Sequence, residues 1–227
     1  GTRCGIDYWP IFRRRFGDRM SDAVLVIFGN RTAAEVAEAA RAAMYAGKLP
    51  GQRIEQLWFD PERFVSHDRP RLEAAATRIS YLAAVSDEAW RLRIDEACQQ
   101  AGWTAETVIH PTAVISPSAT IEAGAFIGPL AVVSSEARVG AHSIVHIHAS
   151  VGHDCQVGAF CSILPGARLS GNVRIGDRVL VGSNAFIGAG LKVGDDCRID
   201  ALSYVGRDIP EGHLVSPRLP RPVKRTS

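Results

Sequence analysis

Residues Val151–Gly190 read VGHDCQVGAFCSILPGARLSGNVRIGDRVLVGSNAFIGAG, with an aliphatic side chain at every sixth position. The same period continues in both directions, from Ile109 to Val205, and 17 of 17 positions carry Ile, Val or Leu. An α-helix repeats its apolar face every 3.6 residues, so a six-residue period does not fit a helix. A β-sandwich would need turn signals at a spacing of about 8–12 residues. The period therefore indicates a repeat architecture.

A second pattern accompanies the first, because a small side chain follows four residues after the aliphatic one in 13 of the 17 hexads. The exceptions are Val173, Val179, Leu191 and Ile209. Residues two apart on a strand point to the same side, so each hexad offers one large and one small inward residue. The positions between them carry residues that suit tight corners. We expect a solenoid over 106–210 in which three hexads close a triangular coil and five to six coils stack.

Residues 20–105 have the order of expected strands and helices of a small parallel α/β domain of the Rossmann-like kind. Two of its segments open with helix-capping residues, Thr32 and either Ser86 or Asp87. Such a domain would also cover the open end of the solenoid, whose bare strand edges invite aggregation. The expected elements are a strand over Ala23–Gly29, a helix over Thr32–Gly47, strands over Arg53–Asp60 and Ile79–Val85, and a helix that ends at Gly102.

The loop after the first strand, Gly29-Asn30-Arg31-Thr32, is a candidate phosphate site because it precedes a helix N-terminus. It has a single glycine and is no dinucleotide fingerprint. Arg31 could pair with a phosphate or could be a solvated loop arginine. Asp60 follows the second strand, where such folds often contact a ribose. We predict Gly29, Asn30, Arg31 and Asp60 as substrate-binding residues.

The two ends of the chain lack the six-residue apolar repeat. Residues 1–19 are basic, and Met20 followed by SDAVLVIFG resembles a natural start, so we interpret 1–19 as an extension or an expression-derived segment. A basic arm that binds an anionic partner is the alternative. Residues 211–227 form a C-terminal tail.

The composition of the chain limits which partners and which cellular setting we expect. The net charge of +2 gives no reason to expect a nucleic acid partner, and no apolar run reaches the length of a membrane helix. The five cysteines lack zinc-ribbon spacing, and Cys155, Cys161 and Cys197 fall on the small inward position. We interpret them as reduced packing residues of a cytoplasmic protein.

Two stretches, Val108–Ile121 (VIHPTAVISPSATI) and Val151–Gly190, resemble the hexapeptide-repeat acyltransferases with a left-handed β-helix. Within them the chain is similar to the two-domain sugar-nucleotide acetyltransferases, which include sialic-acid O-acetyltransferase-like proteins and N-acetyltransferases of 4-amino-4,6-dideoxy sugars. The resemblance implies acetyl-CoA as co-substrate, a nucleotide-linked sugar as acceptor and no metal. It also implies a homotrimer with sites between neighbouring β-helices and a role in surface-polysaccharide or glycan biosynthesis.

The resemblance assigns roles to individual residues. His153 matches the catalytic general base and Asp154 its acidic partner, while the backbone N–H of Gly171 matches a donor to the thioester oxygen. Coenzyme contacts are expected from Ser162, Gly171, Gly188 and Gly190. Histidine suits proton transfer near neutral pH, and an adjacent carboxylate can hold its tautomer.

Three departures from the family pattern leave questions open. Ser162 stands where the branch often has a second histidine, Asn30-Arg31-Thr32 replaces a glycine- and histidine-containing loop, and Ser216–Arg225 (SPRLPRPVKR) replaces the usual C-terminal segment.

Two other functions are compatible with a β-helix. His142, His146, His148 and His153 crowd one region, and the spacing from His148 to His153 resembles two zinc ligands of γ-class carbonic anhydrases. A third histidine would be needed near position 112, which is Thr112. We expect His142, His146 and His148 at an interface or a substrate cleft. A non-catalytic scaffold is the other alternative, but a scaffold has no need of the His153-Asp154 pair.

Overall fold

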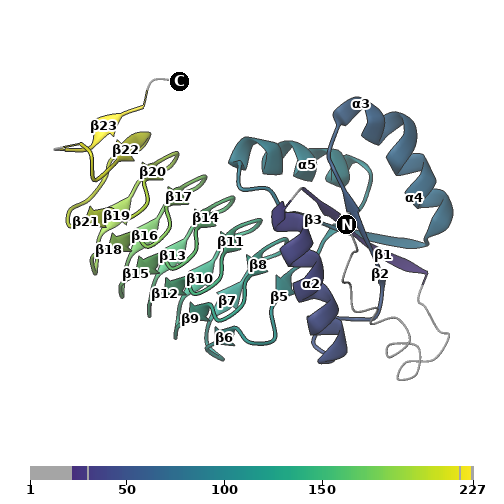
Figure 1. Cartoon of the computed structure of the whole chain (residues 1–227), viewed down its shortest axis with the longest axis horizontal. Helices are drawn as coiled ribbons and strands as arrows, with labels where there is room; N and C mark the ends of the chain where they lie inside the picture. Colours follow the sequence, from purple (N-terminus) through teal and green to yellow (C-terminus); the bar gives the residue numbers. More distant parts are fainter. Residues whose placement is uncertain (1–21, 30, 220, 226–227) are drawn as a thin grey trace, which may run out of the picture.

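The computed structural model describes residues 22–29, 31–219 and 221–225. It has an α/β part followed by a long three-sided stack of short strands, and the C-terminal strands lie at the end of the stack far from the α/β part (Figure 1). The fold class predicted from the sequence is confirmed.

The α/β part is built on a parallel four-stranded sheet in the order β2-β1-β3-β4. All six residues of β1 are buried, as expected for a central strand with both faces covered. Asp87 caps the last helix by accepting a hydrogen bond from the N–H of Trp90 at 3.0 Å. The elements are β1 (Ala23–Phe28), α2 (Arg31–Tyr45), β2 (Arg53–Leu57), β3 (Arg78–Ala83), α5 (Glu88–Gln100) and β4 (Thr104–Ala105).

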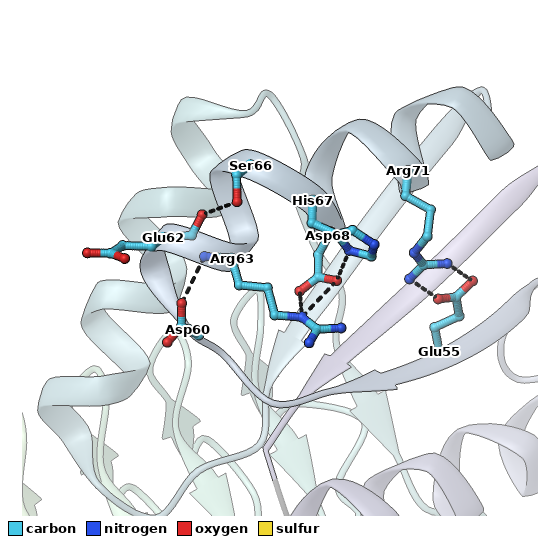
Figure 2. Close-up of polar contacts among 8 residues, drawn as sticks. All are labelled: Glu55, Asp60, Glu62, Arg63, Ser66, His67, Asp68 and Arg71. Atoms are coloured by element: carbon cyan, nitrogen blue, oxygen red, sulfur yellow. Dashed lines mark hydrogen bonds and ion pairs between the residues drawn. The ribbon is translucent and has the colours of Figure 1, made fainter.

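The sequence analysis predicted no helix between the second and third strands, and this was wrong. The chain forms α3 (Pro61–Arg63), a π-helical turn η1 (Phe64–Asp68) and α4 (Arg69–Ala75) there. Asp60 caps α3 by accepting from the N–H of Arg63 at 2.8 Å (Figure 2). Pro70 lacks an N–H and crowds the preceding turn, which explains the wider turn before it.

The stack has 17 strands, β5 to β21, and each ends on a member of the aliphatic series. The strands are β5 (Val108–Ile109), β6 (Val114–Ile115), β7 (Thr120–Ile121), β8 (Phe126–Ile127), β9 (Val132–Val133), β10 (Arg138–Val139), β11 (Ile144–Val145), β12 (Ser150–Val151), β13 (Gln156–Val157), β14 (Ser162–Ile163), β15 (Arg168–Leu169), β16 (Arg174–Ile175), β17 (Leu180–Val181), β18 (Phe186–Ile187), β19 (Lys192–Val193), β20 (Arg198–Ile199) and β21 (Tyr204–Val205).

These strands form the three faces of a prism. The first face contains β5, β8, β11, β14, β17 and β20; the second contains β6, β9, β12, β15, β18 and β21; the third contains β7, β10, β13, β16 and β19. Parallel partners are 18 residues apart, as in Ser150 with Arg168. The aliphatic residues point inward with the small residues and form one continuous core.

In the middle of the prism, each corner turns through one residue with left-handed backbone. From Gly124 to Leu202 this residue follows the aliphatic one by three positions, and its φ is between 55° and 62° wherever it is not glycine. Asp154 is one of them, with φ 59°. The corner therefore fixes the direction in which the preceding side chain leaves the prism.

The last coil is shorter than the period predicts. Ile209 pairs with Val193, and Val215 pairs with Ile199, so each is 16 residues from its partner instead of 18. Ile209 is therefore a large core residue, which explains why it broke the small-residue pattern. The chain ends in β22 (His213–Val215), which joins the first face, and β23 (Val223–Lys224), which pairs with β22 in antiparallel fashion.

The α/β part packs on the first face of the prism. Phe126 and Ile144 point outward from this face into a core shared with α2. Arg91 of α5 is fully buried there, and its guanidinium donates to the carbonyl of Val85 at 2.7 Å, to the hydroxyl of Ser162 at 2.8 Å and to the carbonyl of Phe160. Burial lowers the pKa of Arg91 to about 10. The first face is thus covered by the chain itself.

Candidate functional site

His153 and Asp154 lie at the corner between β12 and β13, where the chain passes from the second face to the third. The Nδ1 atom of His153 is 2.7 Å from Oδ2 of Asp154. Both side chains are more than half exposed, at 58% and 51%. A carboxylate at Nδ1 holds a proton there and leaves Nε2 as the basic nitrogen. The pair therefore presents a base to the outside of the prism.

Gly171 lies one coil further along the same corner and faces the imidazole. A Cβ at this position would lie 2.3 Å from Nε2 of His153, so a side chain here would displace the imidazole from this position. Among the residues that the structure describes, none accepts a hydrogen bond from the Gly171 N–H. The corner therefore holds a basic nitrogen and an uncommitted backbone donor next to each other, the two elements that acyl transfer requires.

The other residues predicted to contact a coenzyme lie in different surroundings. Gly190 follows Gly171 along the same corner, and its N–H donates to the Gly171 carbonyl at 3.0 Å. The N–H of Gly188 donates to the carbonyl of Val205 at 2.9 Å. Ser162 is on the first face, only 1% exposed, and its hydroxyl donates to the carbonyl of Ser86 at 3.2 Å. The structure does not bring Ser162 to His153, and its coenzyme role stays a prediction.

Three of the predicted substrate residues, Gly29, Arg31 and Asp60, lie around the carboxyl end of the α/β sheet. Gly29 follows β1, and a Cβ there would lie 2.4 Å from the carbonyl oxygen of Ala84. Arg31 is exposed at the start of α2, and Asp60 follows β2. Asn30 is outside the described residues.

Asp60 and the helix that it caps carry a set of polar contacts on the outside of the α/β part (Figure 2). Arg63 and His67 both contact the buried carboxylate of Asp68, at 3.2 Å and 3.1 Å. Arg71 pairs with Glu55 of β2 at 2.7 Å. The first two contacts lie within the helical segment after Asp60, and the Arg71–Glu55 pair links this segment to β2.

Two tryptophans at this edge were missed by the sequence analysis. Trp58 follows β2 and is 57% exposed, and its ring centroid is 6.4 Å from that of Trp90 on α5. Together with Gly29 and Val85 they line a shallow niche. The position of Trp58 directly after a strand of such a domain could have identified it as a binding candidate, because an aromatic ring can stack on a nucleobase.

The remaining clustered histidines serve mainly the contact between the two parts of the chain. His142 is buried between the rings of Tyr81 and Phe160 and lies 3.1 Å from Asp95 of α5. Burial, and the positive charge of Arg91, lower the pKa of His146 to about 4. His148 is exposed. Within the described ranges no three His, Cys, Asp or Glu side chains are grouped as metal ligands would be.

No helix among the described residues is long and apolar enough to span a bilayer.

Comparison with known proteins supports the hexapeptide interpretation. The family model "Hexapeptide repeat of succinyl-transferase" matches residues 172–207. A search of curated proteins finds no match.

Solved structures match both parts of the chain. The perosamine N-acetyltransferase of Caulobacter crescentus, solved with CoA and GDP-perosamine, is 26% identical with a TM-score of 0.72, covering 85% of this chain and 92% of its own. The acetyltransferase domain of PglB from Neisseria gonorrhoeae, solved with acetyl coenzyme A, is 27% identical with a TM-score of 0.74, covering 89% and 100%. WeeI from Acinetobacter baumannii, 18% identical with a TM-score of 0.75 over 88% and 100%, shares the fold. The predicted resemblance is confirmed: the chain carries the hexapeptide repeat and has the left-handed β-helix fold, with the preceding α/β part, of these acetyltransferases.

Proposed function

We propose that this chain is a sugar acetyltransferase that moves acetyl from acetyl-CoA to an amino or hydroxyl group of a nucleotide-linked sugar. The observation that carries the proposal is the corner at which His153, Asp154 and the Gly171 N–H meet. It occurs in a chain whose fold matches acetyltransferases solved with acetyl coenzyme A or CoA.

In the proposed mechanism, Nε2 of His153 takes the proton from the acceptor amine or hydroxyl as its nitrogen or oxygen attacks the thioester carbon. Asp154 holds Nδ1–H and stabilises the imidazolium that forms. The Gly171 N–H donates to the oxygen of the tetrahedral intermediate. The intermediate then collapses, the carbon–sulfur bond breaks, and the imidazolium returns its proton to the departing thiolate.

The acceptor is assigned to the carboxyl edge of the α/β sheet. Parallel α/β sheets bind ligands at this edge, where the strand order reverses, which here is between β1 and β3. Arg31 and the start of α2 suit a diphosphate, and Asp60 suits a ribose. The GDP-perosamine bound by the Caulobacter enzyme is a ligand of this chemical class.

The proposed reaction needs two copies of the chain. The α/β part covers the first face, whereas His153 lies at the corner between the second and third faces. A sugar held at the α/β edge of one copy is therefore proposed to meet His153 of the next, in a homotrimer. The acceptor class suggests a role in polysaccharide or glycan biosynthesis. The four described cysteines are free and buried, which agrees with the proposed cytoplasmic setting.

The test is thiol release from acetyl-CoA with a panel of nucleotide-linked amino sugars, nucleotide-linked hydroxyl sugars and the corresponding free sugars. Release that depends on a nucleotide-linked acceptor, with a product heavier by one acetyl group in mass spectrometry, is expected. Equal release with free sugars would contradict the assigned acceptor, and no release with any member would contradict the transferase. The same sample analysed for zinc and tested for CO₂ hydration addresses the carbonic anhydrase alternative.

A further inference from the structure

The proposed oxyanion donor, the N–H of Gly171, shares one peptide unit with the carbonyl of Ser170. A peptide unit is planar and trans, so its C=O and its N–H point in opposite directions. A group that holds the Ser170 carbonyl toward the inside of the prism therefore also turns the Gly171 N–H outward, to the side on which the imidazole of His153 lies. The orientation of this single peptide decides whether the corner has its donor.

The thiol of Cys155 is the group that holds this carbonyl. Its Sγ donates to the Ser170 oxygen at 2.9 Å, and the side chain belongs to the continuous core of the prism. Burial raises the pKa of the Cys155 thiol, so the thiol keeps the proton that it donates. Within the part of the chain that the structure describes, no other group donates to the Ser170 oxygen.

An earlier coil closes the same corner in a different way. The carbonyl of Ser134, at the position equivalent to Ser170 two coils before it, accepts a hydrogen bond from the backbone N–H of Ala137 at 3.3 Å. At the corner with Gly171 the equivalent backbone donor is Val173, and among the described residues its N–H makes no such bond. The thiol therefore takes the place of the backbone donor at the corner that carries the proposed chemistry.

The backbone on both sides of this peptide is fixed by its own hydrogen bonds. The Ser170 N–H donates to the carbonyl of Ile187 at 3.0 Å, and the Asn172 N–H donates to the carbonyl of His153 at 2.8 Å. A Cβ on Gly152 would lie 2.7 Å from the carbonyl carbon of Ser170, so the peptide packs directly against backbone of the previous coil. The remaining freedom of the peptide is a rotation of its own plane, which the thiol restrains.

The prism contains the same contact at other inward positions, made by a thiol or by a hydroxyl. The Sγ of Cys197 donates to a corner carbonyl at 3.0 Å, and the Oγ of Ser143 donates to the carbonyl of Gly158 at 2.8 Å. A hydroxyl at such a position therefore reaches the carbonyl as well as a thiol does. Ala137, one coil before Cys155, shows that the stack also accepts a side chain without a donor there.

We propose that Cys155 is a positioning residue of the transferase, whose thiol holds the Ser170–Gly171 peptide with its N–H turned to the oxygen of the tetrahedral intermediate. The inference rests on the proposed function, because it takes the Gly171 N–H as the oxyanion donor. Since the donor acts in the transition state, the contribution of Cys155 is expected in kcat and not in the binding of acetyl-CoA.

Steady-state thiol release by the full-length protein tests the role of the thiol in catalysis. Cys155→Ala is expected to lower kcat about tenfold, less than the roughly 10²–10³ that follows complete loss of an oxyanion donor, with the KM for acetyl-CoA unchanged. Cys155→Ser restores most of kcat, because its hydroxyl can donate to the same carbonyl. The pH profile of kcat/KM is the same in both variants, because the His153–Asp154 pair is intact.

Cys197→Ala is the matched control for these measurements. It removes an equivalent bond from a buried thiol to a corner carbonyl, at a corner between the third and first faces. We expect it to keep the kcat of the wild type.

An NMR measurement reads the peptide itself and does not depend on activity. Ser170–Gly171 is the only Ser-Gly pair in the chain, so labelling with ¹³C-carbonyl serine and ¹⁵N-glycine leaves one cross-peak in an HNCO spectrum. The carbonyl resonance is expected to move in Cys155→Ala, where the oxygen loses its hydrogen bond, and to keep its wild-type position in Cys197→Ala.

The outcomes separate this inference from the proposed function. If the cross-peak does not move in Cys155→Ala, or if it moves while kcat keeps its wild-type value, the thiol does not position the donor and the inference is wrong, while the proposed function stands. An equal fall in kcat in Cys197→Ala would assign the effect to a loosened core, and a shifted pH profile in Cys155→Ala would assign it to His153; either result overturns the inference. If the wild type releases no thiol with any acceptor, the proposed function is overturned and this inference with it.

Discussion

At the scale of single residues, the proposed chemistry depends on a corner of the prism that is built for geometric reasons. The left-handed φ of 59° at Asp154 turns the chain, and the carboxylate of the same residue reaches back to Nδ1 of His153. One residue therefore both makes the corner and orients the imidazole. The pair of His153 and Asp154 was predicted from the sequence because it matches the base and the acidic partner of the family that the chain resembles. The sequence could not show that Ser162 turns toward Arg91, because the domain contact brings together residues 71 positions apart.

Replacing Asp154 with Asn should separate orientation from binding. An amide at Nδ1 no longer favours the tautomer with a basic Nε2, so we expect kcat to fall about 10²-fold while KM for acetyl-CoA changes little. Steady-state thiol release measures both constants. Glu136→Gln is the control, since Glu136 occupies the equivalent position one coil earlier and has the same left-handed backbone. An equal fall in kcat for both variants would show that the effect comes from disturbing a corner of the prism and not from breaking the His153–Asp154 pair.

His146 should make the stability of the protein sensitive to acid. Its folded pKa of about 4 is below the ordinary value of 6.5, because of burial and the nearby charge of Arg91. The unfolded chain therefore binds more protons between pH 6.5 and pH 4, and stability falls as the pH is lowered through this range. Between pH 7 and pH 5 the contribution is about 2 kcal/mol.

Urea unfolding at pH 7 and pH 5 measures this loss. His146→Leu should abolish this part of the pH dependence, whereas His148→Leu, an exposed histidine two residues away, should keep it. An unchanged pH dependence in His146→Leu would show that other groups carry the acid sensitivity.

At the scale of elements, the strands of the prism were predictable one by one and the helix after β2 was not. The six-residue period marks every strand from β5 to β21 because core packing alone dictates it. Residues 61–75 contain Pro70 and a π turn, which break the regular apolar spacing that identifies a helix. The shortened last coil was equally hidden, since its two missing residues appear only in the pairing of Ile209 with Val193.

The contact of α5 with the first face should contribute measurably to stability. Arg91→Met leaves the carbonyl of Phe160 and the hydroxyl of Ser162 without their buried donor. We expect the free energy of unfolding to fall by about 3 kcal/mol, since each orphaned group costs roughly 1–3 kcal/mol. Arg93→Met is the control on the same helix, where an exposed guanidinium over Trp90 is worth only about 0.5–1 kcal/mol. Denaturant unfolding that gives the same loss for both variants would contradict the role of Arg91.

At the scale of the whole molecule, the two parts of the proposed site lie on different sides of one prism. The α/β edge is tied to the first face through Arg91 and Ser162, and the corner with His153 lies between the other two faces. The sequence predicted both parts, but their relative position depends on side-chain contacts between the parts that no local pattern encodes. Under the proposed function, this arrangement makes assembly a condition of activity.

Mixed oligomers test whether the site is shared. His153→Ala removes the base and Arg31→Glu opposes a diphosphate, so each variant alone should be weakly active. Co-expressed with different tags and purified through both, the hetero-oligomers should regain activity, because an intact corner of one copy meets an intact α/β edge of another. Activity no greater than the sum of the two parents would place the whole site within one chain.

The central claim, acetyl transfer with His153 as the base, is tested most directly by the kcat of His153→Ala for acetyl-CoA and the nucleotide-linked sugar found in the panel. The account predicts that kcat falls by about 10²–10⁴, the usual contribution of a general base, while the protein keeps its oligomeric state and its affinity for CoA. Turnover within twofold of the wild type would contradict it.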